Sequence, residues 1–219
     1  MEDWSEHERL IGEKETLGFY LEGHPITRYQ KELACIVTTQ LRDVKPGRVI
    51  VAGYIENIRT RSGLRGRMAE IRLDDRTARV NLTLYSEVYQ KYRSLLITDK
   101  LIIARGEALA DDYYDFGYYI KADSVYDLNK VRNEFASLKL KLDKTMLANG
   151  KITEIKRLLL PYANHTRSVS IEYDNGRVIG RLDLGQQWRI EINDHLIDDL
   201  TTLLGEENVR LDYHNVNLN

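Results

Sequence analysis

Arginine is concentrated in one short stretch of this chain, residues 59–67. The stretch reads Arg-Thr-Arg-Ser-Gly-Leu-Arg-Gly-Arg and contains four arginines, two glycines and no acidic residue. Guanidinium groups on a flexible, glycine-containing loop can reach successive phosphates of a nucleic acid and can stack on its bases. The same composition also suits a hairpin that only keeps the surface soluble. The residues with this candidate role are Arg59, Arg61, Arg65 and Arg67.

A second candidate site is the tyrosine-rich stretch at residues 111–119. Tyr113 and Tyr114 stand there among further aromatic residues, so bases could stack on them. Three aspartates in the same stretch would repel phosphate, however. Two interpretations therefore stay open for this stretch: contact with a nucleic acid, and a packed loop or protein contact.

Catalytic and metal-binding motifs are missing from the sequence or arise by chance. Asp115-Phe116-Gly117 copies a kinase tripeptide, but the glycine-rich loop, the strand lysine and the catalytic loop of kinases do not accompany it. The five histidines are scattered without the spacing of metal ligands, and the single cysteine cannot form an internal disulfide. We therefore expect a non-enzymatic binding module with no cofactor and no metal ion.

The composition is that of an ordinary water-soluble protein. Of the 219 residues, 42% are hydrophobic and 30% are charged, and the formal net charge is −2. A strongly basic nucleic-acid binder is thereby excluded, so any such binding must depend on local patches. No apolar run approaches the roughly 18 residues that a membrane span requires. The acidic N-terminus lacks the apolar region of a secretion signal, and the lone cysteine fits a reducing cytosol.

The elements that would position the arginines follow a barrel pattern. We expect strands at residues 49–59, 68–74 and 78–85, a helix at 86–97, and strands at 101–110 and 118–128. Asp75-Arg76-Thr77 is short enough to form a hairpin turn between the second and third strands. Three strands, a helix and two more strands is the order of the five-stranded OB fold, which commonly binds oligonucleotides.

Alternation of apolar and polar residues assigns the two faces of the second and third strands. The residues predicted to point into the barrel are Ala69, Ile71, Leu73, Val80, Leu82 and Leu84. OB folds bind a nucleic-acid strand on the opposite, outer face beside these two strands. The residues predicted on that face are Arg79, Asn81, Thr83 and Tyr85.

The rest of the chain reads as two further segments. Residues 1–44 form a helical segment and connector, with short helices at 6–21 and from residue 25 to about residue 34, and resemble the tail of a preceding domain. Residues 45–130 form the barrel, and residues 131–219 form a small α+β domain of order β-α-β-β-β-α-β.

Local signals place several elements of that last domain. Strands are expected at residues 169–173, 178–184 and 188–192. The second helix should begin after an N-cap at Asn193 or Asp194 and should end at Gly205.

Fourteen residues near the N-terminus resemble a known family. The stretch from Glu13 to Ile26 reads Glu-Lys-Glu-Thr-Leu-Gly-Phe-Tyr-Leu-Glu-Gly-His-Pro-Ile. It is similar to the segment that precedes the OB domain in bacterial replicative DNA polymerase III alpha subunits. Leu73-Asp74-Asp75-Arg76, Leu84-Tyr85 and Trp188-Arg189-Ile190 also resemble that family. The resemblance covers the whole chain and identifies it with the C-terminal region of the subunit, whereas the polymerase palm and its metal-binding aspartates have no counterpart here.

The resemblance implies a non-catalytic module of DNA replication in the bacterial cytoplasm, at the replisome. The barrel would lie near the single-stranded DNA template, and the C-terminal domain would bind the tau subunit of the clamp loader beside other replisome proteins. Trp188 and the helix at 194–204 are candidates for the tau contact, although core packing is the better explanation for Trp188 and the helix leucines. We expect a monomer without membrane contact. The family's clamp-binding peptide has no counterpart in residues 1–12.

Two alternatives remain open. The chain could be a protein-interaction platform whose barrel binds no nucleic acid, which the near-neutral charge and the acidic tyrosine stretch favour. It could also be an RNA-binding module of the anticodon-binding type. Salt-dependent binding to oligonucleotides would distinguish the DNA-binding replication module from the protein-interaction platform. A preference for DNA or RNA would distinguish it from the anticodon-binding type.

Overall fold

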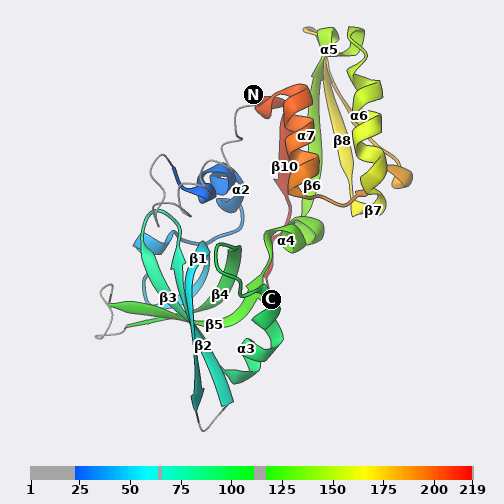
Figure 1. The fold of residues 1–219 in the computed structure, drawn as a ribbon. Helices are drawn as coiled ribbons and strands as arrows, with labels where there is room; N and C mark the ends of the chain where they lie inside the picture. Colours follow the sequence, from blue (N-terminus) through cyan, green and yellow to red (C-terminus); the bar gives the residue numbers. More distant parts are fainter. Residues whose placement is uncertain (1–22, 64–65, 111–116, 219) are drawn as a thin grey trace, which may run out of the picture. The chain divides into compact units, whose positions relative to one another are not determined.

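A computed structural model describes residues 23–63, 66–110 and 117–218 of the chain (Figure 1). The chain divides into two compact units, one that ends at Asp127 and one that begins at Leu128. The helix expected at residues 6–21 lies outside the described residues, as do Arg65, Tyr113 and Tyr114 of the candidate sites.

The first unit is a closed five-stranded barrel with the strand order β1-β2-β3-β5-β4. Its elements are β1 Gly47–Gly63, β2 Gly66–Asp74, β3 Arg79–Leu84, α3 Ser86–Tyr92, the 3₁₀ turn η3 Arg93–Leu95, β4 Leu101–Ala110 and β5 Tyr118–Tyr126. Neighbouring strands are antiparallel except β3 and β5, which pair in parallel and close the barrel. The predicted OB order of three strands, a helix and two strands is therefore confirmed.

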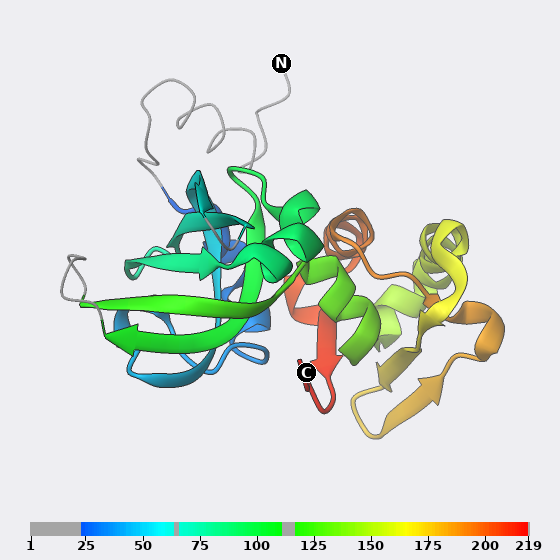
Figure 2. The same cartoon turned by 90° about the horizontal axis from the view of Figure 1, so that it is seen from below.

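The core of the barrel contains the side chains that the alternating pattern predicted to point inward. Ile71, Leu73 and Leu82 are fully buried, and the other three predicted inward residues are buried with them. Helix α3 packs against this core through Val88 and Tyr89 (Figure 2). Burying one face of each strand against a common interior is the main stabilising contribution to such a barrel.

Gly106 permits a close approach of two barrel strands. The register between β4 and β5 shifts between Arg105 and Gly106. A Cβ atom at Gly106 would overlap the backbone carbonyl of Lys121 on the neighbouring strand. Only glycine fits such a contact without displacing the backbone.

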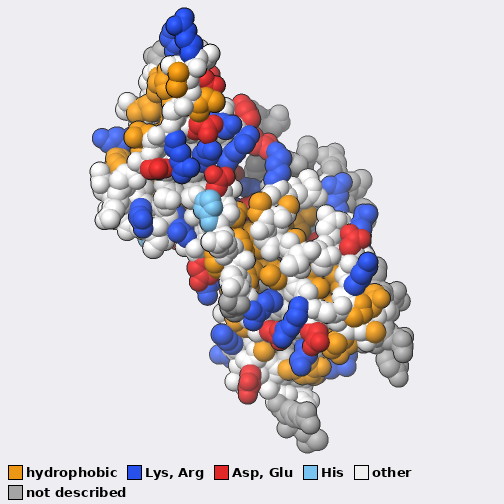
Figure 3. Space-filling view, turned by 180° about the vertical axis from the view of Figure 1, so that it is seen from behind, with side chains coloured by type: hydrophobic (Ala, Val, Ile, Leu, Met, Phe, Trp, Pro, Cys, Tyr) orange, Lys and Arg blue, Asp and Glu red, His pale blue; other side chains and the backbone are white. Residues whose placement is uncertain are grey.

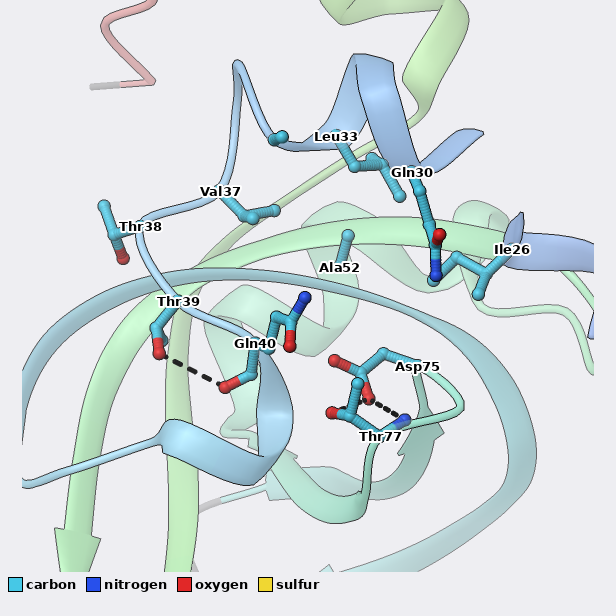
Figure 4. A pocket seen from close by; sticks show the side chains of 11 residues that line it. Ile26, Gln30, Leu33, Val37, Thr38, Thr39, Gln40, Ala52, Asp75 and Thr77 are labelled. Atoms are coloured by element: carbon cyan, nitrogen blue, oxygen red, sulfur yellow. Dashed lines mark hydrogen bonds between the residues drawn. The ribbon is translucent and has the colours of Figure 1, made fainter. Parts of the chain in front are cut away.

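A buried carboxylate ties the N-terminal connector to the barrel. The connector contains η1 Pro25–Tyr29, α2 Gln30–Leu33 and η2 Leu41–Asp43. Asp75 accepts hydrogen bonds from the backbone N–H of Leu41 at 2.8 Å, Thr77 at 2.8 Å and Ala78 at 3.1 Å. Asp75 and Thr77 line a pocket of about 330 Å³ beneath α2 (Figure 4). The predicted hairpin turn at residues 75–77 is confirmed, and Asp75 holds both the turn and the connector.

The second unit is a four-stranded sheet with the order β10-β6-β8-β9. Its elements are α4 Leu128–Phe135, β6 Ala136–Asp143, α5 Lys144–Ala148, α6 Lys151–Leu159, η4 Leu160–Tyr162, β7 Ala163–Arg167, β8 Val169–Asp174, β9 Ile179–Asp183, η5 Gln186–Trp188, α7 Asp194–Leu204, η6 Glu206–Asn208 and β10 Val209–Tyr213. Helices α6 and α7 lie on the same face of the sheet (Figure 1). Leu138, Leu140 and Leu142 are buried on that face with Leu196 and Leu200 of α7.

The opposite face of this sheet carries charged side chains that pair with one another. Glu172 on β8 lies 2.8 Å from Lys139 Nζ and 3.5 Å from Lys141 Nζ on β6. The hydrogen bond from Lys139 holds the pKa of Glu172 below its usual value, and the charges of both lysines add to this effect against the opposing effect of desolvation. Basic and acidic side chains stand side by side in the view from behind (Figure 3).

One predicted strand of the second unit is wrong. Residues 188–192 form no ladder; Ile190 makes only isolated bridges to Ala163 and Arg167 of β7, a strand that the sequence pattern did not reveal. The alternation of Ile190 and Ile192 arises because both side chains enter the core from an extended segment. Helix α4 was not predicted either.

The predicted limits of α7 are confirmed. The side chain of Asn193 caps its first turn by accepting a hydrogen bond from the N–H of Leu196 at 3.0 Å. Gly205 ends the helix with a φ of +90°, and its N–H donates to the carbonyl of Thr201.

Candidate nucleic-acid interface

The outer face of β1, β2 and β3 is built by the register of the three strands. Arg72 on β2 lies opposite Asn57 on β1 and Asn81 on β3. One row further along, Arg59 and Glu70 are opposite each other in the same way. Because side chains alternate along a strand, these residues all project from the outer surface of the barrel.

The arginine-rich stretch is a pair of strands rather than the flexible loop that was expected. The β1–β2 ladder continues to the pair Gly63 and Gly66, so Arg59 and Arg61 belong to β1 and Arg67 belongs to β2. All three are exposed. Arg67 stands two residues before the inward-facing Ala69 on β2, so the two side chains share a face. Arg67 therefore projects from the face of this hairpin opposite to that of Arg59 and Arg61.

Acidic side chains hold two of the arginines on the outer face. Glu56 Oε2 lies 3.4 Å from Arg72 Nε and 3.2 Å from Arg79 Nε. Arg79 Nε also lies 3.0 Å from Asp74 Oδ2. A phosphate group that binds these guanidinium groups must therefore compete with carboxylates already in place.

The predicted arginines differ in how far they are engaged. Arg61 Nη2 lies 3.4 Å from Glu70 Oε2. In contrast, neither Arg59 nor Arg67 forms an ion pair with any residue in the described part of the chain. Arg59 is thus the guanidinium on the outer face that is most available to an anion.

A shallow pocket of about 360 Å³ on the outer face is lined in part by residues of the predicted site. The residues that line it are Glu56, Asn57, Arg59, Glu70, Arg72, Arg79 and Asn81. Three guanidinium groups, two amides and two carboxylates can bind a phosphodiester or the polar edge of a base through hydrogen bonds.

Two of the residues predicted on the strand face, Thr83 and Tyr85, differ in their exposure to solvent. Thr83 is only 7% exposed, because Glu70 on β2 and Lys121 on β5 flank it in the register with longer side chains. Thr83 therefore belongs to the outward-facing row as predicted, but its neighbours cover it and leave it little exposed surface. Tyr85, just after β3, is 44% exposed, and the amine of Lys121 lies 5.9 Å from the centre of its ring.

Sequence reasoning missed Arg72, Lys121 and Glu56 as members of this surface. Arg72 was left out of the candidate site, although the alternation of residues 68–74 turns its side chain outward and could have identified it. Lys121 joins the surface because β5 pairs in parallel with β3, across the closure of the barrel. No local pattern indicates such a pairing between strands distant in the sequence.

The same described ranges contain neither a cluster of metal ligands nor a helix that could span a membrane. No group of three or more His, Cys, Asp or Glu side chains there could hold a metal ion. No helix in those ranges is long and apolar enough to cross a membrane.

Solved structures match parts of this chain at low sequence identity. Asparaginyl-tRNA synthetase from Pyrococcus horikoshii matches with a TM-score of 0.35 and 17% identity over 41% of this chain and 22% of that chain. The small single-stranded DNA-binding protein from Streptomyces coelicolor matches with a TM-score of 0.33 and 12% identity over 39% of this chain and 95% of that chain.

Two family models match parts of the chain, and curated relatives match it at higher identity than the solved structures do. Residues 49–128 match the OB-fold nucleic acid binding domain, and residues 154–205 match the C-terminal domain of DNA polymerase III subunit alpha. The chain is 34% identical to DNA polymerase III subunit alpha of Vibrio cholerae over 97% of its own length and 19% of that protein. It is 35% identical to the same subunit of Pseudomonas aeruginosa over 94% of its length and 18% of that protein.

The chain thus spans about a fifth of the length of the curated relatives that it matches. Both units of the structure contain a match, the barrel to the OB-fold domain and the second unit to the C-terminal domain. The chain belongs to the DNA polymerase III alpha subunit family and corresponds to the C-terminal region of that subunit.

Proposed function

We propose that this chain serves bacterial DNA replication as a non-catalytic module that guides single-stranded DNA and attaches the polymerase to the clamp loader. The DNA would lie on the outer face of β1, β2 and β3. The observation that carries this proposal is the exposed Arg59 on that face, which lines a shallow pocket together with Arg72 and Arg79. Membership of a polymerase subunit family makes DNA the nucleic acid to test first.

The surface offers the two kinds of contact that single-strand binding needs. Arg59 forms no ion pair with a carboxylate among the described residues, so it can bind a phosphate without first breaking such a pair. Tyr85 exposes part of its ring, on which a base can stack, and Lys121 adds a positive charge beside that ring. Because Glu56 and Asp74 compete for the other guanidinium groups, we expect weak binding that supplements the rest of a polymerase.

Fluorescence anisotropy with labelled oligo-dT at low and moderate salt tests the DNA role. The unaltered chain should bind, with an affinity that falls as salt rises. Arg59→Ala should weaken binding to all sequences and reduce the salt slope by about one. Arg93→Ala, which removes an exposed arginine on η3, is the matched control and should bind like the unaltered chain.

The carboxylates on the outer face favour one competing function, a protein-interaction platform. Glu56, Glu70 and Asp74 already neutralise three arginines there, as they would on a surface that binds no anion. If oligo-dT does not bind even at low salt, this function replaces the DNA role. Stronger binding of oligo-U than of oligo-dT would instead point to an RNA-binding module.

We also assign the attachment to the clamp-loader tau subunit to the second unit. The match to the C-terminal domain of the alpha subunit falls within this unit and supports the assignment. Two candidates from the sequence are engaged in packing: Leu196 and Leu200 of α7 are buried, and Trp188 packs against the same core with Lys156 5.9 Å from its ring centre. Binding of purified tau to the immobilised chain, measured by biolayer interferometry, tests the assignment.

A further inference from the structure

The strand β9 lies at an edge of the second sheet and is uncovered. In the order β10-β6-β8-β9 it pairs only with β8. All five of its residues, Ile179–Asp183, are exposed to solvent. No residue in the described ranges forms a ladder with its outer side. A sheet edge of this kind can accept a further strand through backbone hydrogen bonds.

The hydrogen-bond pattern shows which backbone groups are available. The N–H of Asn175 donates to the carbonyl of Val178, and the N–H of Leu184 donates to the carbonyl of Val169. In an antiparallel pair, hydrogen-bonded and non-bonded residues alternate, so residues 178, 180, 182 and 184 direct their backbone groups toward β8. Ile179, Arg181 and Asp183 therefore direct their N–H and C=O groups to the free edge.

The side chains of this edge do not block it. Val178, Ile179 and Leu182 are 65%, 64% and 60% exposed. Natural sheet edges are protected by proline, by unpaired charges or by bulges. Here the strand contains no proline, its register with β8 is regular, and Arg181 Nε lies 3.0 Å from Asp183 Oδ1.

The same edge offers space for apolar side chains of an added strand. Val178 and Leu182 project from one face of the strand with Gly180 between them, because side chains alternate. A Cβ atom built at Gly180 would meet nothing within 4 Å. Figure 3 shows hydrophobic side chains gathered at the surface in the part of the view that holds the second unit.

The charge around β9 indicates the chemistry of its partner. Residues 151–162 and 175–192 contain six basic side chains, Lys151, Lys156, Arg157, Arg177, Arg181 and Arg189, and three acidic ones, Glu154, Asp183 and Glu191. The amine of Lys156 lies 5.9 Å from the centre of the Trp188 ring, so these two stretches are neighbours in the structure. Glu172 and Asp174 on the paired strand β8 add two negative charges, and Lys139 and Lys141 beside Glu172 add two positive ones. The surroundings of β9 are therefore net positive, although the whole chain has a net charge of −2. Two copies would repel each other there, whereas an acidic segment would be attracted.

We propose that β9 is the docking strand for an extended segment of the partner protein in which apolar residues alternate with acidic ones. The segment pairs with the backbone of Ile179, Arg181 and Asp183, and an apolar side chain occupies the space over Gly180. This inference rests on the proposal that the second unit binds tau, and it names the strand that makes the contact.

The test compares two substitutions at one position, with purified tau as the probe and biolayer interferometry as the measurement. Arg181→Pro removes an N–H that the β8–β9 ladder does not use, so the sheet should still form. Arg181→Ala removes the charge and keeps that N–H. We expect Arg181→Pro to weaken tau binding by on the order of tenfold or more, and Arg181→Ala by about threefold at most.

A second variant keeps the test valid if proline disturbs the fold. Ile179→Glu places a negative charge on the exposed edge without changing the backbone; it repels an acidic segment and should also weaken binding by on the order of tenfold. Circular dichroism and thermal unfolding check that each variant is folded.

The outcomes separate this inference from the function on which it rests. Folded Arg181→Pro and Ile179→Glu variants that bind tau as well as the unaltered chain would overturn the role of β9 and leave tau attachment standing. An unaltered chain that does not bind tau would overturn both. A concentration-dependent dimer that Arg181→Pro abolishes would identify a second copy as the occupant and overturn the choice of partner.

Discussion

Glu56 shows how a single side chain can set the strength of a binding surface. Its carboxylate lies within 3.4 Å of Arg72 and 3.2 Å of Arg79, so two guanidinium groups of the proposed DNA face share one negative charge. These groups are about half exposed, where ion pairs add little to stability but still compete with a phosphate. At this scale the acidic residues are as informative about DNA binding as the arginines.

Replacing Glu56 with glutamine should strengthen binding to single-stranded DNA. Glu56→Gln releases Arg72 and leaves Arg79 paired with Asp74 alone, so oligo-dT should bind about three- to tenfold more tightly, with a salt slope steeper by about one. Fluorescence anisotropy measures both quantities. The matched control is Glu87→Gln, which removes the same charge from an exposed position on α3. Equal affinities of the two variants would show that Glu56 does not restrain the arginines.

Loss of the Asp75 carboxylate should destabilise the barrel. Asp75→Ala leaves the N–H groups of Leu41, Thr77 and Ala78 without their acceptor, which should lower the free energy of unfolding by about 3 kcal/mol. Urea denaturation followed by circular dichroism measures the change. Asp43→Ala, at an exposed position in η2, should alter stability by less than about 0.5 kcal/mol. A comparable loss in both variants would contradict the role assigned to Asp75.

At the scale of elements, the pairing of strands decides which side chains share a surface. The β1–β2 ladder turns Arg59 and Arg61 to one side and Arg67 to the other, although all three stand in one short stretch. The parallel pairing of β3 with β5 places Lys121 opposite Thr83. Any change that shifts these registers should affect DNA binding and stability together.

Gly106 is the position where strand pairing is most sensitive to an added methyl group. Gly106→Ala should destabilise the barrel by about 2–4 kcal/mol, because its Cβ would overlap the Lys121 carbonyl and force β5 away from β4. Thermal and urea unfolding measure the loss. The control Gly63→Ala adds a Cβ whose nearest neighbour would be 3.9 Å away, so its effect should be within about 0.5 kcal/mol. Unchanged stability of Gly106→Ala would contradict the close approach.

At the scale of the whole molecule, the chain contains two separate hydrophobic cores. The core of the barrel includes Ile71 and Leu82, the core of the second unit includes Leu140 and Leu200, and the two clusters share no residue. Each unit can therefore bury its own apolar surface. This separation matches the division of the proposed functions, with DNA at the barrel and a protein partner at the second sheet.

Each unit should fold and act when it is produced alone. We expect fragments 1–127 and 128–219 each to unfold cooperatively in calorimetry, because each retains a complete core. Fragment 1–127 should retain the binding of oligo-dT, and fragment 128–219 should retain the binding of tau. A fragment that lacks a cooperative transition would show that its core depends on the other unit.

Patterns along the sequence determined the elements whose signals are local. Alternation identified Ile71 and Leu82 as barrel interior because a strand with one buried face must repeat every two residues. Asn193 and Gly205 marked the limits of α7 because the backbone groups at helix ends need particular partners or conformations. The order of these elements, together with the N-terminal signature, indicated the OB fold and the polymerase subunit family.

Only the tertiary structure decided how distant residues meet. The parallel closure of the barrel brought Lys121 to Tyr85, and the strand register brought Glu56 to Arg72 and Arg79. The alternation of Ile190 and Ile192 resembled a strand, but the segment packs into a core without joining a ladder. Periodicity reports which side of a segment is buried, whereas the identity of its neighbour depends on contacts across the fold. The sequence alone therefore indicated the OB fold and the family, and the packing of distant strands decided which arginines remain available to an anion.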